Sequence, residues 1–160
     1  MNEIKLFIDG SCNPQKKIGY GAYILLDDEN INIEDLKQKV VLQKFENTSS
    51  TKLEIETFIW AIKNIDTKDT SIKVYTDCQN IINLPNRKEK LQSLNYHSSS
   101  GKLLNNSELY KEFFDLLDKY TCEFVKVKGH KKNSLKDEID TIFNIVDKAA
   151  RNILRSEVKD

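Results

Sequence analysis

The sequence predicts an α/β fold with a five-stranded mixed sheet, in which three antiparallel meander strands precede two parallel strands and helices flank the sheet. Three observations lead to this expectation. The chain has 160 residues, of which 39% are hydrophobic and 31% charged, as in one globular domain. Its first third alternates apolar and polar residues between turn-rich loops, which is typical of strands. Beyond it, helical and strand patterns alternate, as they do when crossover helices connect parallel strands.

The antiparallel strands are expected at 3–10, 18–26 and 39–45. In the first of them, Leu6 and Ile8 alternate with residues that would face the other side of the sheet. The loops between these strands are rich in turn-forming or acidic residues. Three successive strands joined by such loops predict an antiparallel meander.

A helix is predicted over 51–65, after a start signal at Ser50 or Thr51. Trp60 lies within its apolar stretch, and we expect it to pack in the core rather than to stack on a base. The stretch carries apolar residues at helical spacing, namely Ile55, Phe58, Ile59, Ile62 and Ile65.

The second half of the chain continues the alternation of strands and helices. Pro85 would stop a short helix, and a basic stretch that is helical or irregular follows it. A polar loop occupies 94–106. Strands are expected at 72–76 and 122–128, and helices near 78–84, at 107–120 and at 138–155. We expect residues 1–160 to form one domain.

The composition excludes several classes of protein. No apolar run approaches the ~20 residues that span a bilayer, and the first residues lack the layout of a signal peptide. The three cysteines, Cys12, Cys78 and Cys122, have no zinc-type spacing and predict reduced thiols in a cytoplasmic protein. A net charge of zero excludes nucleic-acid binding by bulk charge alone, although basic residues cluster at 87–102 and 126–136.

Three carboxylates lie where strands and helices are expected to begin or end. Asp9, in the segment LFIDGS, lies near the end of the first strand, Glu54 in the first turn of the helix, and Asp77 after the fourth strand. Carboxylates gathered at one edge of a sheet repel one another unless a cation lies between them. Alternatively, Asp9 belongs to a turn, Glu54 to a capping box with Thr51, and Asp77 caps a helix.

The ordered segments FIDGS, TKLEIETFIWAI, VYTDCQ, VKVKGH and VDKAAR resemble those of the type 1 ribonuclease H family. The resemblance covers nearly the whole chain, and each segment lies on the kind of element that the family uses. It implies the RNase H-like fold and a stand-alone catalytic domain.

The resemblance assigns the family's metal-binding carboxylates and a mobile auxiliary histidine. Two residues along a helix turn a side chain by about 200°, so Glu56 cannot share the face of Glu54. In the last helix, Asp140 lies seven residues before Asp147 on nearly the same face and fits the commoner spacing from the histidine, but VDKAAR is the segment that matches the family. The assigned metal-binding and catalytic residues are Asp9, Glu54, Asp77 and Asp147, with His130 as the auxiliary catalytic residue.

The resemblance further implies an endoribonuclease that hydrolyses the RNA strand of an RNA/DNA hybrid and leaves 5′-phosphate and 3′-hydroxyl ends. It implies two Mg²⁺ ions with substrate bound, with Mn²⁺ as a substitute. The 2′-hydroxyl distinguishes RNA from DNA, and the residues assigned to contact the nucleic acid are Asn13, Ser50 and Gln79. We expect a monomer that needs neither a membrane nor an obligate protein partner.

Two other functions remain open at this stage. One is another metal nuclease of the same superfamily, such as a resolvase or integrase core, which shares an Asp-led first strand. The other is a protein without catalytic activity, either a catalytically silent nucleic-acid-binding domain with the same fold or an inhibitor or immunity-type module. Cleavage assays with matched substrates separate these functions.

Overall fold

The computed structural model describes residues 2–27, 32–65, 70–128 and 137–159. The sheet has five strands in the order β3-β2-β1-β4-β5. β1 pairs antiparallel with β2, and β2 with β3, whereas β4 is parallel to both β1 and β5. This is the predicted mixed sheet. The strands are β1 (Asn2–Asn13), β2 (Ile18–Leu26), β3 (Val41–Glu46), β4 (Thr70–Thr76) and β5 (Thr121–Lys126).

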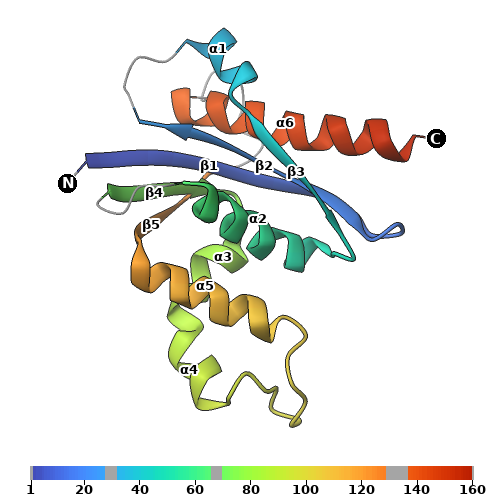
Figure 1. The fold of residues 1–160 in the computed structure, drawn as a ribbon, viewed down its shortest axis with the longest axis vertical. Coiled ribbons are helices and arrows are strands. Elements are labelled where there is room, and N and C mark those ends of the chain that lie inside the picture. The colour runs from blue at the N-terminus through green and yellow to red at the C-terminus, as the bar shows by residue number, and fades with distance from the viewer. Residues whose placement is uncertain (1, 28–31, 66–69, 129–136, 160) are drawn as a thin grey trace.

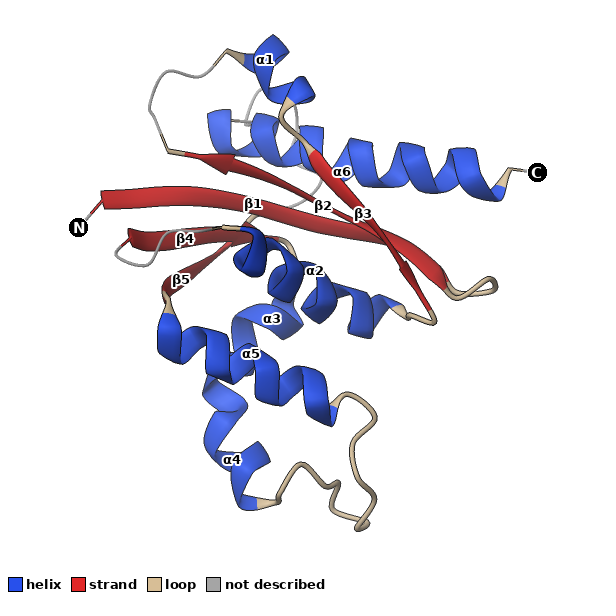
Figure 2. Ribbon diagram, viewed as in Figure 1, coloured by secondary structure: helices blue, strands red, loops and turns tan. Residues whose placement is uncertain are grey.

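Helices cover both faces of the sheet (Figures 1 and 2). The final helix lies along one face with the short α1, and the others lie on the opposite face. No helix within the described ranges is both long and apolar enough to cross a membrane. The helices are α1 (Ile33–Gln38), α2 (Ser50–Asn64), α3 (Gln79–Asn83), the 3₁₀ helix η1 (Leu84–Arg87), α4 (Lys88–Ser93), α5 (Ser107–Lys119) and α6 (Glu138–Val158).

The side chains of β1 alternate between two apolar clusters because successive residues of a strand face opposite sides. Leu6 and Ile8 join the cluster with α2 and α5, whereas Phe7 joins the cluster with α6. By the same alternation Asp9 faces α6 and Gly10 faces α2, where a Cβ added at Gly10 would lie 3.1 Å from Leu53. The sheet thus directs Asp9 toward the helix that carries Asp147.

Trp60 packs as expected. It is partly buried against the cluster beneath α2, and its ring lies edge-on to Tyr23, with ring centroids 4.9 Å apart, and to Phe45, with centroids 6.1 Å apart. Such edge-to-face pairs add to the stabilisation from burial. The prediction that Trp60 serves core packing is confirmed.

Glycines in the first hairpin let α2 approach the sheet closely. A Cβ at Gly19 would lie 2.7 Å from Leu53, and a Cβ at Gly21 would lie 2.6 Å from Thr57 Oγ1 and 3.0 Å from its Cγ2. Thr57 is short and β-branched, so its side chain cannot turn aside freely. The distance between α2 and the sheet, and with it the position of Glu54, therefore depends on these glycines.

We expect Gly21→Ala to destabilise the protein by about 1–3 kcal/mol, the usual cost of overpacking a close contact. Urea unfolding measures this loss. Adding Thr57→Ala removes the two nearest atoms that the new methyl group would meet and leaves only Phe45 Cε2, at 3.2 Å, so the loss in the double variant should be smaller than the sum of the two single losses. Additive losses, or none in Gly21→Ala, would contradict this account of the contact.

Candidate active site

Asp9 lies inside β1 rather than near its end. It pairs with Ala22 of β2, and β1 continues to Asn13, so Asp9 and Gly10 form no turn. The parallel pairing with β4 ends earlier, at Phe7 and Tyr75. Asp9 and Asp77 each follow this last pair by two residues. They therefore lie level with each other where β1 and β4 separate, at the kind of crevice where α/β sheets bind ligands.

The four carboxylates that the family resemblance assigns to metal line one groove, which has a volume of about 280 Å³. β1 contributes Asp9, α2 contributes Glu54, α6 contributes Asp147, and Asp77 follows β4. The groove also includes Ser50 at the start of α2. The fold thus gathers acids that are far apart in sequence. The remaining lining residues are Gly10, Ser11, Cys12, Leu53 and Arg151.

The carboxyl group of Asp9 is the most strongly perturbed acid in this groove. Burial raises the pKa of Asp9 from 3.8 to about 9, and the hydrogen bond to Asp147 and the negative charges of Asp77 and Asp147 act in the same direction. Burial therefore favours the protonated form of Asp9 as long as no cation lies beside it. The positive groups of the protein therefore do not fully offset the negative charges of the carboxylates in this part of the groove.

Glu54 interacts with the residues that follow β4. Burial raises the pKa of Glu54, and the charge of Asp77 adds to this effect, while hydrogen bonds from the side chains of Cys78 and Asn80 oppose it. The side chain of Cys78 also caps α3, since Sγ accepts from the N–H of Ile81 at 3.4 Å. The helix cap is therefore Cys78 rather than Asp77, and burial raises the pKa of this thiol to about 12.

Glu56 and Asp140, the alternatives to Glu54 and Asp147, have other contacts. Glu56 accepts a hydrogen bond from Thr48 Oγ1 at 2.5 Å. Asp140 is buried and forms a capping box at the start of α6, in which Oδ2 accepts from the Asp137 N–H at 3.1 Å. Neither residue lines the groove. The Thr51–Glu54 capping box does not form, because Ser49 is the cap of α2.

Arg151 is a groove residue that the sequence analysis did not single out as functional. It lies one turn after Asp147 on α6, and its Nη2 is 2.9 Å from Asp147 Oδ2. The i,i+4 spacing of an acid and a base signals such a pair. Because the pair is partly exposed, it contributes little to stability. It places a cation beside the carboxylates of the groove.

The residues assigned to nucleic acid differ in their surroundings. Ser50 is exposed at the groove. The side-chain amide of Gln79 forms two hydrogen bonds: its Oε1 accepts from Lys126 Nζ at 2.7 Å, and its Nε2 donates to Asn83 Oδ1 at 2.9 Å. Asn13 ends β1, and its Oδ1 accepts from the Lys16 N–H at 3.0 Å in the following turn. His130 lies outside the described residues.

The donor set of the groove suits a hard divalent cation. All four acids offer carboxylate oxygens, which Mg²⁺ and Mn²⁺ prefer. The pKa of Asp9 is raised first by burial and then by the neighbouring acids, and a bound cation would offset both effects. Among the described residues no three His, Cys, Asp or Glu side chains already stand as a ligand cluster. The residues fit the ion by their chemistry, and binding would have to draw their oxygens together.

Comparison with known sequences places the chain among ribonucleases H. The sequence profile of the family described as RNase H matches residues 1–153. The ribonuclease H of Caldicellulosiruptor saccharolyticus is 28% identical over 158 residues, which cover 97% of this chain and 98% of that protein. The ribonuclease H of Clostridium botulinum is 26% identical over 149 residues, covering 90% and 95% of the two chains.

Solved structures share the fold. LC9-RNase H1, a type 1 RNase H with the type 2 active-site motif, aligns with a TM-score of 0.67 at 15% identity over 94% of this chain and 73% of that one. A foamy viral protease-reverse transcriptase in complex with dsDNA aligns with a TM-score of 0.63 at 12% identity over 94% of each chain. At these identities the likeness shows the architecture alone.

Proposed function

Because the chain belongs to the RNase H family, we propose that it is an endoribonuclease that hydrolyses the RNA strand of RNA/DNA hybrids with two divalent metal ions, leaving 5′-phosphate and 3′-hydroxyl ends. The observation that carries the proposal is the groove in which Asp9, Glu54, Asp77 and Asp147 gather. Family membership supports ribonuclease H activity, and the geometry of the groove supports these four residues as its centre.

The four carboxylates are the proposed ligands of Mg²⁺, for which Mn²⁺ is a possible substitute. When bound, the two ions would supply an activated water and offset the charge that develops on the phosphate and the leaving 3′-oxygen. Asp9, which belongs to β1 and lines the groove, would bind the ion in its ionised form and lose the proton that its burial favours. The raised pKa of Asp9 makes this release of a proton part of metal binding.

Other residues of this chain would orient the substrate. Arg151 holds Asp147 and presents its guanidinium in the groove, so it can pair with a phosphate oxygen as well. Ser50, Asn13 and Gln79 are the proposed contacts to the nucleic acid, with the 2′-hydroxyl as the feature that identifies the RNA strand. His130 is the proposed auxiliary group for proton movement or product release.

Residues outside the groove would bind the paired strand. α4 and the chain after it carry Lys88, Lys90 and Lys102, and we propose that this segment contacts phosphates, with an affinity that falls as salt rises. We further propose that residues 1–160 act as one monomeric domain. The compartment would be the cytoplasm, where its three free cysteines stay reduced.

Cleavage of a labelled RNA/DNA hybrid tests the proposal. We expect hydrolysis of the RNA strand with Mg²⁺ or Mn²⁺, none with a chelator, and no cleavage of the matched double-stranded DNA or RNA. The products should be ligatable through their 5′-phosphates. A protein that binds the hybrid in Mg²⁺ and Mn²⁺ but leaves the RNA strand intact would contradict the proposed activity.

A further inference from the structure

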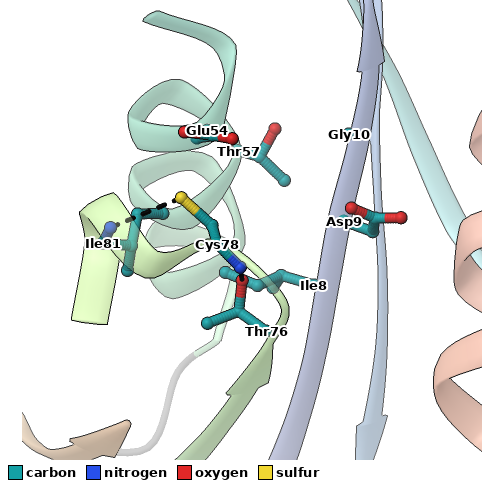
Figure 3. A pocket seen from close by; sticks show the side chains of 8 residues that line it. All are labelled: Ile8, Asp9, Gly10, Glu54, Thr57, Thr76, Cys78 and Ile81. Atoms are coloured by element: carbon teal, nitrogen blue, oxygen red, sulfur yellow. Dashed lines mark hydrogen bonds between the residues drawn. The ribbon is translucent and has the colours of Figure 1, made fainter. Parts of the chain in front are cut away.

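A small cavity lies behind the carboxylates, between α2, β1 and the segment that follows β4 (Figure 3). It has a volume of about 10 Å³, which is close to the least space that holds one water molecule. Asp9 and Glu54 line both this cavity and the groove. The other lining residues are Ile8, Gly10, Thr57, Thr76, Cys78 and Ile81.

Two polar atoms of this lining lack a hydrogen-bond partner in the described part of the chain. They are Glu54 Oε2 and Thr57 Oγ1, and both are buried. Thr57 as a whole is only 1% exposed. A buried polar atom without a partner costs about 1–3 kcal/mol, and most such atoms in proteins bond to protein or to ordered water.

The remaining polar side chains of the cavity are already engaged. Thr76 Oγ1 accepts from the Cys78 N–H at 3.1 Å, and Cys78 Sγ accepts from the Ile81 N–H at 3.4 Å. Both bonds are drawn in Figure 3. The Cys78 side chain also hydrogen-bonds the Glu54 carboxylate. Glu54 Oε2 and Thr57 Oγ1 still lack a partner in the described part of the chain, and they belong to side chains one helical turn apart on α2.

The Thr57 side chain lies close against the sheet beneath it. Its Oγ1 and Cγ2 lie where a Cβ at Gly21 would come within 2.6 and 3.0 Å, and its Oγ1 lies 3.4 Å from the place of a Cβ at Gly10. Figure 3 shows Thr57 between Glu54 and the strand that carries Asp9 and Gly10. Thr57 is only 1% exposed, so its hydroxyl is enclosed between α2 and the sheet.

We propose that one water molecule binds in this cavity and links the Thr57 hydroxyl to Glu54 Oε2, which makes Thr57 a positioning residue for Glu54. The water donates to the carboxylate and accepts from the hydroxyl. With its inner oxygen held in this way, Glu54 keeps the other oxygen directed to the groove. The inference rests on the proposed function, because it takes Glu54 as a ligand of the divalent ion.

Manganese affinity without substrate tests this role. We compare Thr57→Val, which keeps the shape of the side chain without the hydroxyl, with Thr57→Ser, which keeps the hydroxyl. Isothermal titration calorimetry should show binding weakened about tenfold in Thr57→Val, at the lower end of what the loss of a ligand's supporting hydrogen bond costs, and nearly unchanged in Thr57→Ser. Unchanged affinity in Thr57→Val would overturn the inference.

A double-mutant cycle separates positioning from a general effect on the fold. If Thr57 acts through Glu54, Thr57→Val has no further effect on manganese affinity in a Glu54→Gln background. The same loss in both backgrounds would mean that the hydroxyl acts elsewhere, and would overturn the inference. Thermal unfolding of each variant confirms that affinity is compared between folded proteins.

A high-resolution crystal structure of the unmodified protein supplies an independent test. We expect ordered density within hydrogen-bond distance of both Thr57 Oγ1 and Glu54 Oε2. An empty cavity, or direct contact between the two side chains, would overturn the inference even if the variants fail to fold. Failure of the unmodified protein to bind Mn²⁺ would instead contradict the proposed metal site, so the two failures are distinguishable.

Discussion

Asp147→Asn is expected to abolish cleavage of an RNA/DNA hybrid, whereas Asp140→Asn in the same helix leaves it largely intact. Asp147 lines the groove and shares a hydrogen bond with Asp9, while Asp140 caps the start of α6. Removing one carboxylate that stabilises the transition state should slow hydrolysis by about 10³-fold or more. Single-turnover rates at saturating Mg²⁺ measure the difference.

Asp77→Asn should lose activity to the same degree as Asp147→Asn, because both carboxylates are proposed ligands of the divalent ions that offset the charge developing on the phosphate. Asp140→Asn is the matched control, with the same chemical change on the same helix as Asp147→Asn. It weakens a capping box and costs about 0.5–2 kcal/mol of stability, so rates are normalised to the folded fraction. Full activity in Asp147→Asn, or equal loss in Asp140→Asn, would reverse the assignment of the fourth ligand.

Asp9→Asn is expected to stabilise the metal-free protein while destroying its activity. The pKa of Asp9 is 3.8 as an ordinary carboxyl and about 9 in the fold. Between these two values the folded protein holds a proton that the unfolded chain has released, so the contribution of Asp9 to stability falls as pH rises. Asparagine has no such penalty. The gain in the variant should therefore be near zero at pH 4 and reach several kcal/mol at pH 8, at no more than about 1.4 kcal/mol per pH unit.

Urea unfolding of both proteins from pH 4 to pH 9 measures this difference, in which the effects of titrating groups far from Asp9 cancel. Mg²⁺ should raise the stability of the unmodified protein more at pH 8 than at pH 5, and should have little effect on Asp9→Asn. A stability difference that stays constant or shrinks as pH rises would show that burial and the neighbouring acids do not act on Asp9 in this way.

The strand and helix order followed from sequence because the apolar periods are clear. Leu6 and Ile8 alternate toward one cluster, and the apolar residues of α2 recur at helical spacing. The acidic segment before Leu36 offered no such period, and α1 was missed. Only Leu36 of that helix is buried, and its start depends on Asn32, whose side chain accepts from the Glu34 N–H at 3.0 Å.

The sequence singled out Asp9 as a candidate metal ligand but predicted its position in the first strand less well. The pair Asp9-Gly10 is typical of a turn, and the first strand was expected to end there. In the structure β1 continues to Asn13 because β2 pairs with it throughout, from Lys5 with Leu26 to Asn13 with Ile18. Register between strands depends on both partners and on the turn between them, so one strand's own pattern does not determine where pairing stops.

The polar contacts behind the groove were beyond prediction from sequence. Nothing in a linear pattern indicates that Cys78 caps α3 and interacts with Glu54, or that Thr57 meets the glycines of the hairpin. These contacts depend on how closely α2 packs on the sheet. By contrast, Asp147 could be preferred to Asp140 from its local segment, and the structure places only Asp147 at the groove.

The packing of α6 on β1 has a consequence for biosynthesis. Phe7, near the amino end, is buried in one cluster with Ile142, Val146 and Ala150 near the other end. While a ribosome is still making the chain, that face of the sheet is covered only by the short α1, and its other apolar side chains are open to association with other nascent proteins. Contacts between such distant segments also slow folding. A chain cut short before α6 would expose this face permanently, so chaperones and proteases should select against truncated products.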